Sequence, residues 1–192
     1  MEYCADLDIG IEYILKDLDY FSKLPITNEA PAHFIIPKNI ISVEFYSWLN
    51  SNNLELEHAE LFYCPPKGNI FIHVDEIYPS DSCKINWVYD QGETLMRWYK
   101  LKEHKELQLL KSPIGTNYWA ADQKDCTLEY QYRIGKPTLI NASEIHDVIN
   151  PSNHRRFCVS IVVKVIGEDL RVGYSRLKDL LKDYVLPTTV GV

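Results

Sequence analysis

A histidine and an aspartate two positions apart, His73 and Asp75, end the strand-like run "NIFIHVD" at residues 69–75. On a β-strand, residues i and i+2 point to the same face, so both side chains are expected to project to one side. An imidazole and a carboxylate placed in this way can bind one metal ion. Two ligands hold a metal ion poorly, so we expect a third ligand, a histidine, from a distant strand.

His146 is the best placed of the remaining histidines, because it follows a predicted strand and a short turn, 71 positions after Asp75. Two histidines and one carboxylate form the facial triad of non-heme Fe(II) oxygenases, which leaves three coordination sites for a cosubstrate and O₂. The other histidines lie in a proline-bearing loop, on a face with Glu57 and Glu60 that we expect to be solvated, in a charged segment, and after a turn: His33, His58, His104 and His154.

An arginine, Arg156, begins the apolar run "RFCVSIVV" ten positions after His146. An arginine at the start of an apolar strand is costly unless it is paired, and its planar guanidinium matches a carboxylate through two hydrogen bonds. If Arg156 points inward, Cys158 and Ser160 share its face, and Ser160 can add a hydroxyl donor. Arg155 would then point outward, and a shift of one residue in register would exchange the two arginines.

The order of these residues resembles the 2-oxoglutarate/Fe(II)-dependent dioxygenase superfamily. The resemblance is carried by His73-Val74-Asp75, His146 and Arg156, within "LFYCPPKGNIFIHVDE", "KINWVY" and "KPTLINASEIHDVINPSNHRRFCVSI". It covers residues 54–166 and implies a double-stranded β-helix core. It also implies that the two histidines and the aspartate bind iron, that Arg156 holds the far carboxylate of 2-oxoglutarate, and that the metal binds the 2-oxo acid end of this cosubstrate.

The resemblance implies further contacts to the cosubstrate. Family members often add a tyrosine or an asparagine from a nearby strand, and Tyr63 and Asn86 are the candidates in this sequence. The sequence departs from the family's Arg-x-Ser pattern at Cys158. Because a thiol is a poor hydrogen-bond donor, the far carboxylate would then depend on Ser160, Tyr63 or water.

Three classes of function are compatible with these residues. The first is a hydroxylase that uses Fe(II), 2-oxoglutarate and O₂, and Asp75 favours hydroxylation because halogenases of the family lack this carboxylate. The second is a cupin-like metal-binding or sensing module without 2-oxoglutarate turnover, which Cys158 keeps open. The third is a non-catalytic β-sandwich interaction domain that binds no metal.

Charge and composition limit the partners and the location. The 192 residues carry a formal net charge of −7, which argues against a broad nucleic-acid surface and favours a peptide, amino acid or other small-molecule substrate. We expect a soluble, cytoplasmic protein, because the chain shows neither a basic signal-peptide segment nor an apolar run of the ~20 residues that span a bilayer. The five cysteines form no CxxC pair and are expected to be reduced. The oligomeric state is not indicated.

The elements that position these residues are predicted to be strands flanked by helices. Apolar residues recur at helical spacing over 7–24, 40–50 and 174–186, and residues 26–39 are expected to form a loop. Turn residues separate apolar or alternating runs typical of strands, which cover 54–64, 69–74, 83–89, 94–101, 127–134, 137–142 and 155–166.

Strands joined by short turns, without intervening helices, indicate antiparallel sheets as in a sandwich, jelly roll or barrel. We predict a mainly β protein of one domain: an N-terminal helical region over 1–53 that packs on the core, a double-stranded β-helix (jelly-roll, cupin-like) catalytic core over 54–166, and a C-terminal helix and tail over 167–192. Residues 103–126 show no clean period. We expect them to form a long loop that acts as a lid near His73, with Trp119 lining the substrate entrance.

Overall fold

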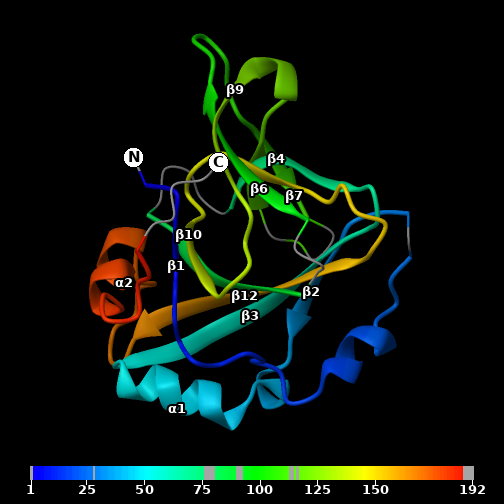
Figure 1. Cartoon of the computed structure of the whole chain (residues 1–192). Coiled ribbons are helices and arrows are strands. Elements are labelled where there is room, and N and C mark those ends of the chain that lie inside the picture. The colour runs from blue at the N-terminus through cyan, green and yellow to red at the C-terminus, as the bar shows by residue number, and fades with distance from the viewer. Residues whose placement is uncertain are drawn as a thin grey trace.

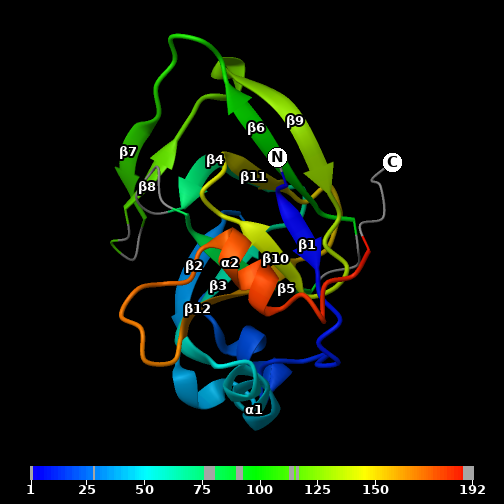
Figure 2. The same cartoon turned by 90° about the vertical axis from the view of Figure 1, so that its left-hand side faces the viewer.

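The computed structural model describes residues 2–27, 29–75, 81–89, 93–112, 115 and 117–187. Within these residues, two six-stranded antiparallel sheets form most of the molecule (Figures 1 and 2). Sheet 1 has the order β1 (Cys4–Asp6), β10 (Thr138–Asn141), β5 (Cys83–Tyr89), β12 (Arg156–Val165), β3 (Leu54–Cys64) and β2 (Ala32–Ile36). Sheet 2 has the order β7 (Gln108–Lys111), β8 (Asn117–Ala120), β4 (Asn69–Asp75), β11 (His146–Ile149), β6 (Leu95–Leu101) and β9 (Cys126–Tyr132).

Eight of these strands have the connectivity of a double-stranded β-helix. Along the chain they are β3, β4, β5, β6, β9, β10, β11 and β12, and they alternate between the sheets except at the pair β6–β9. In sheet 1 the first strand lies beside the eighth, then the third and the sixth; in sheet 2 the second lies beside the seventh, then the fourth and the fifth. This jelly-roll order confirms the predicted fold class.

The largest hydrophobic cluster lies on the outer face of sheet 1, where α1 (Val43–Ser51) packs against β3 (Figure 1). The hydroxyl of Ser42 accepts a hydrogen bond from the backbone N–H of Phe45 at 3.2 Å and caps this helix. The helix buries Phe45, Trp48 and Leu49. The apolar core therefore supports sheet 1 from outside and leaves its inner face available for polar groups.

The predicted helix over residues 7–24 is wrong. Gly10 has a φ of +71°, a left-handed conformation that interrupts an α-helix, and only Leu18–Lys23 forms a short 3-10 helix. Leu7 forms a β-bridge with Val185, and Leu15 forms another with Ile41. These apolar residues are buried through tertiary contacts with an irregular chain, which overrides their helical spacing.

Two segments predicted as loops contain edge strands. Residues 26–39 include β2, which pairs with β3, and residues 103–126 include the hairpin of β7 and β8, which extends sheet 2 beside β4. Residues 113, 114 and 116 of the hairpin lie outside the described residues. Every residue of β7 is exposed, so its sequence did not need the alternation of apolar and polar residues that would have predicted a strand.

The remaining helices are short. Residues Lys38–Ile40 and Gln123–Asp125 form single 3-10 turns, and α2 (Tyr174–Leu180) is shorter than the predicted helix, because a turn follows from residue 181. Residues 188–192 of the predicted tail lie outside the described residues. No described helix combines the length and apolar character needed to cross a membrane. The five cysteines, all within the described residues, are buried and form no disulfide.

Candidate metal centre

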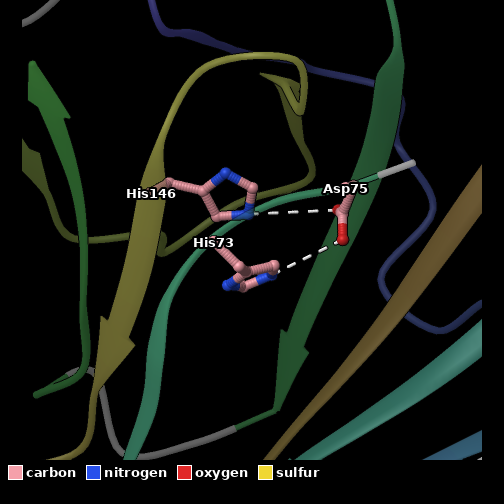
Figure 3. A group of neighbouring side chains, drawn as sticks. All are labelled: His73, Asp75 and His146. Carbon is pink, nitrogen blue, oxygen red and sulfur yellow. Dashed lines mark ion pairs between the residues drawn. The ribbon is translucent and has the colours of Figure 1, made fainter. Parts of the chain in front are cut away.

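His73, Asp75 and His146 meet between the two sheets, as Figure 3 shows. One potential ligand atom from each of the three residues lies within 4.8 Å of the other two. The Nε2 atom of His73 is 3.5 Å from Oδ1 of Asp75, and Nε2 of His146 is 3.9 Å from Oδ2. The sheet brings the distant histidine into place, because β11 pairs with β4 and sets His146 directly opposite His73.

A β-bulge in β4 helps to aim these side chains. The register between β4 and β11 changes from His73 opposite His146 to Ile70 opposite Val148, so β4 advances by three residues while β11 advances by two. The extra residue allows both Ile70 and His73 to line the interior between the sheets. Bulges next to functional sites commonly redirect side chains in this way.

Backbone carbonyls fix both imidazoles for metal binding. The Nδ1 atom of His73 lies 2.7 Å from the carbonyl oxygen of Phe71, and Nδ1 of His146 lies 2.7 Å from that of Glu144. A carbonyl oxygen only accepts hydrogen bonds, so Nδ1 carries the proton in each ring and the Nε2 lone pair faces Asp75. Two such nitrogens and a carboxylate are a donor set that fits Fe(II) and similar divalent ions.

Electrostatics keep two of the ligands, Asp75 and His146, in metal-binding protonation states. Burial and the neighbouring His73 lower the pKa of His146 to about 4. Burial alone would raise the pKa of Asp75, but the opposing effects, of which the positive charge of Lys84 is the largest, hold this pKa well below its ordinary value. At neutral pH the site therefore offers a neutral His146 and an ionised carboxylate.

Lys84 belongs to the same site, although it was not among the residues predicted from the sequence. Its Nζ atom is 3.1 Å from Oδ2 of Asp75 and 2.7 Å from Oε2 of Glu60, and its side chain is only 5% exposed. Burial opposes the charge of Lys84, but these two carboxylates raise its pKa above the ordinary value. The signal was present in the run "CKINWVY", where a lysine occupies the same face of β5 as Asn86.

Glu60 extends this chain of charges toward the edge of sheet 1. Its Oε1 atom is 3.1 Å from Nε2 of His33. Burial raises its pKa, but Lys84 and the hydrogen bond to His33 outweigh this effect and bring the pKa to about 2. The expectation that Glu60 faces solvent beside His58 is therefore wrong: Glu60 is buried, because its strand β3 turns this face toward sheet 2.

A small inner cavity of ≈ 40 Å³ adjoins the triad and is lined by Arg156. Arg156 is 2% exposed, and its Nε atom has no hydrogen-bond partner among the described residues. Arg155 is exposed, so Arg156 is the arginine that faces the interior. Cys158 and Ser160 line the same cavity, as expected for alternate residues of one strand.

Of the other predicted cosubstrate contacts, the structure brings Asn86 and Ser160 to the cavity but not Tyr63. Asn86 accepts a hydrogen bond from the Ser160 hydroxyl at 2.7 Å. Tyr63 neighbours Phe62 on β3 and so projects to the opposite face, where its ring lies 5.4 Å from that of Phe157. Phe62 lines the cavity instead.

A larger cavity of ≈ 430 Å³, called the outer cavity below, adjoins the small one and is lined by two of the three triad residues, His73 and Asp75. The two cavities share His73, Asp75 and Lys84, so the candidate metal centre stands at their junction. The outer cavity is lined by Pro31, Ala32, His33, Glu60, Phe62, Asn69, Ile70, Phe71, His73, Asp75, Lys84, Ser112, Asn117 and Tyr118.

The hairpin of β7 and β8 forms one wall of the outer cavity. Ala120 of β8 is paired with His73, and Tyr118 is paired with Asp75 and lines the cavity. This segment therefore lies on the His73 side of the molecule, as expected for a lid. The expectation for Trp119 is wrong: it is not among the lining residues and packs with Val74, because alternation along β8 turns it to the other face.

No protein-family model matches the sequence, and no curated protein is similar to it. Among solved structures, a mutant of oxalate decarboxylase OxdC from Bacillus subtilis is 10% identical, with a TM-score of 0.35 over 80% of this chain and 30% of that chain, so the chain spans about a third of that protein. EvdO2 from Micromonospora carbonacea var. aurantiaca is 13% identical, with a TM-score of 0.40 over 71% of this chain and 69% of that chain. An oxalate oxidase bound to glycolate is 14% identical, with a TM-score of 0.35 over 95% and 89%. Similarities of this size establish no family, and the double-stranded β-helix rests on the strand order of the chain itself.

Proposed function

We propose that the protein is a non-heme Fe(II)- and 2-oxoglutarate-dependent oxygenase that hydroxylates a peptide, amino acid or other small molecule. The observation that carries the proposal is the buried Arg156, whose Nε has no partner in a cavity that adjoins two histidines and an aspartate. A buried guanidinium nitrogen without a partner is costly, and a carboxylate is the group that satisfies it best.

Charge balance supports a divalent metal together with a dianion. Among the carboxylate, ammonium and guanidinium groups, the cavity walls carry two negative ones, Glu60 and Asp75, and two positive ones, Lys84 and Arg156. These four charges sum to zero. A divalent cation alone would leave two uncompensated positive charges in a buried site, which is unfavourable. A dianion such as 2-oxoglutarate restores neutrality, so each ligand favours the binding of the other.

The size of the inner cavity agrees with the short arm of this cosubstrate. By the measure in which one water occupies about 10–15 Å³, the cavity of ≈ 40 Å³ has room for a few non-hydrogen atoms. It excludes bulky groups. A carboxylate on a short unbranched chain can enter from the triad and reach Arg156.

Each residue of the site has a separate proposed role. His73, Asp75 and His146 would hold Fe(II), which with 2-oxoglutarate and O₂ supplies the conversion of a substrate C–H bond to C–OH while the cosubstrate becomes succinate and CO₂. Lys84 holds one oxygen of Asp75 and so limits how this carboxylate can turn. Arg156 binds and orients the far carboxylate. The outer cavity, which Arg156 does not line, would admit the substrate.

A second candidate, a cupin-like metal-binding or sensing module without 2-oxoglutarate turnover, is favoured by one observation. Cys158 lines the inner cavity where the resembling family has a serine, and the hydroxyl of Ser160 already donates to Asn86. The far carboxylate would then depend on Arg156 more heavily than in the family pattern.

Anaerobic titration of the metal-free protein with Fe(II) and then 2-oxoglutarate tests the proposal. We expect the visible metal-to-ligand charge-transfer band of a chelated 2-oxo acid, and we expect Arg156→Met to weaken cosubstrate binding by at least about tenfold. Arg155→Met is the matched control and should leave the titration unchanged. Iron binding without the band would favour the cupin-like module, and no iron binding would favour a non-catalytic β-sandwich.

A further inference from the structure

We infer that the outer cavity takes a small, uncharged ligand with a flat aromatic ring; if the proposed function holds, this ligand is the substrate. The inference rests on the walls of the cavity, on the pairing of its charges and on its size. It names the chemical class of the ligand, which the metal centre alone does not determine.

Aromatic side chains from both sheets line the cavity. On the side of sheet 1, His33 and Phe62 are stacked, with ring centroids 4.3 Å apart and an interplanar angle of 15°. On the side of sheet 2, the centroids of Phe71 and Tyr118 are 5.4 Å apart, and Phe71 is 49% exposed although it is a large apolar residue. Aromatic faces left open in a cavity favour a ligand ring that can stack on them or meet them edge to face.

The charged groups that line the cavity are already paired with one another. Lys84 lies between Glu60 and Asp75, and Glu60 also contacts His33. His73 and Asp75 face the candidate metal position. An anion would therefore lose its hydration without gaining a free cation from any described lining residue, and a cation would have to compete with Lys84 for Glu60 and Asp75, so either ion pays a large penalty. An uncharged ligand avoids this cost.

Size and rim polarity fit a small molecule with one polar group. The volume of ≈ 430 Å³ lies within the range of about 300–1,000 Å³ that is usual for small-molecule sites. Asn69 and Asn117, both exposed, stand at the lining and offer amide groups to a neutral polar substituent. An anion would instead be directed to Arg156, in an inner cavity about a tenth as large.

Three probes of nearly equal shape test the charge preference: 2-naphthamide, which is neutral, 2-naphthoate, which is an anion, and 2-naphthamidine, which is a cation. Isothermal titration of the metal-free 192-residue chain at neutral pH measures each affinity. We expect 2-naphthamide to bind at least about tenfold more tightly than either ion. The saturated decahydronaphthalene-2-carboxamide, which lacks a flat ring, should bind more weakly than 2-naphthamide.

Variants of the aromatic wall test the location. Phe71→Ala and Tyr118→Ala should each weaken 2-naphthamide binding by about three- to tenfold, because each removes an aromatic contact. Leu109→Ala is the matched control: Leu109 is a 53% exposed apolar residue of the same hairpin that does not line the cavity. Thermal unfolding of each variant verifies that it is folded.

Equal or tighter binding of 2-naphthoate or 2-naphthamidine would overturn the inference, as would unchanged 2-naphthamide binding in both aromatic variants. These titrations use neither iron nor 2-oxoglutarate, so they are independent of the proposed function. Binding of 2-naphthamide by a protein that gives no iron–2-oxoglutarate band would leave the inference standing and remove the proposed function. The iron–2-oxoglutarate band together with a preference for a charged probe would support the proposed function and overturn the inference.

Discussion

Lys84 forms ion pairs with two carboxylates at once, because its ammonium group lies between Glu60 and Asp75. Lys84→Met would leave both carboxylates buried without a cation, and we expect it to lower the free energy of unfolding by about 3–5 kcal/mol. Lys164→Met is the control, because Lys164 pairs with Glu55 at the surface, where such pairs contribute about 0–1 kcal/mol. Urea unfolding of the metal-free variants measures both effects.

A divalent ion should partly replace the missing charge in Lys84→Met. We therefore expect added Zn²⁺ to raise the melting temperature of this variant by more than that of the wild type. Equal loss of stability in Lys84→Met and Lys164→Met would show that Lys84 does not hold the two carboxylates.

Arg156 has the opposite expected effect on the metal-free protein. Because its Nε atom is buried without a partner among the described residues, Arg156→Met removes a desolvated charge and fills similar space with an apolar chain. We expect the melting temperature to stay equal or to rise, with Arg155→Met as the exposed neighbour for comparison. A decrease in the free energy of unfolding of more than about 2 kcal/mol would mean that Arg156 stabilises the metal-free fold and is not a ligand-binding residue.

The lowered pKa of His146 makes the stability of the metal-free protein depend on pH. An unfolded histidine titrates at about 6.5, whereas His146 in the folded protein titrates at about 4 because of burial and of its neighbour His73. Between these values the unfolded state binds the extra proton, so the free energy of unfolding falls as pH falls, by about 3 kcal/mol over the full window. Glu60, with a pKa of about 2, loses its contribution only at lower pH.

Urea unfolding between pH 6.5 and 4 measures this dependence in the wild type and in His146→Gln. The slope should be smaller in His146→Gln, whereas His104→Gln, at an exposed position, should keep the slope of the wild type. An unchanged slope in His146→Gln would contradict the buried, neutral state of this histidine.

At the scale of single residues, spacing along the sequence predicted which side chains the strands bring together. It did not predict the orientation of a side chain where a shift of one residue in register changes the face. Alternation along strands and order along the chain predicted that four residues lie together, and one cavity is lined by all of them: His73, Asp75, His146 and Arg156. Tyr63 was predicted to contact the cosubstrate, but its neighbour Phe62 lines the cavity, because the two side chains point to opposite faces of β3.

The strand β11 carries His146, and a partly buried ion pair between Asp147 and Arg97 holds it to β6. Asp147 accepts hydrogen bonds from Nε of Arg97 at 2.8 Å and from the Tyr99 hydroxyl at 3.0 Å. Asp147→Asn weakens both contacts, and we expect about 2 kcal/mol lower stability and about tenfold weaker binding of Zn²⁺. Asp122→Asn, at an exposed pair with Lys124, is the control and should change neither quantity. Unchanged metal affinity in Asp147→Asn would show that β11 needs no such fixation.

At the scale of elements, the central strands and α1 were predictable, but the sheet edges were not. Central strands are buried on at least one face, and their sequences therefore contain apolar runs, as in β5 and β12. The edge strands β2 and β7 are short, and β7 is exposed throughout, so the local sequence carries little sign of them. The failure at residues 7–24 has another cause, since the apolar spacing there serves an irregular chain buried on sheet 1.

At the scale of the whole molecule, the jelly-roll order divides polar and apolar groups between the two faces of sheet 1. The outer face packs against α1 in the largest hydrophobic cluster, and the inner face presents Glu60, Lys84 and Arg156 to the cavities. The net charge of −7 gives no sign of this balance, because the four charges of the cavity walls cancel. Such a site stays neutral only when the charges of its ligands sum to zero.

The most direct test is therefore the coupling between metal and cosubstrate. Anaerobic isothermal titration measures the affinity for Fe(II) with and without 2-oxoglutarate, in the wild type and in Arg156→Met. We expect 2-oxoglutarate to tighten Fe(II) binding by at least about tenfold in the wild type and to have much less effect in Arg156→Met, because coupling between two ligands is reciprocal and passes here through their charges. Equal affinity for Fe(II) with and without 2-oxoglutarate in the wild type would contradict a charge-balanced site for both ligands.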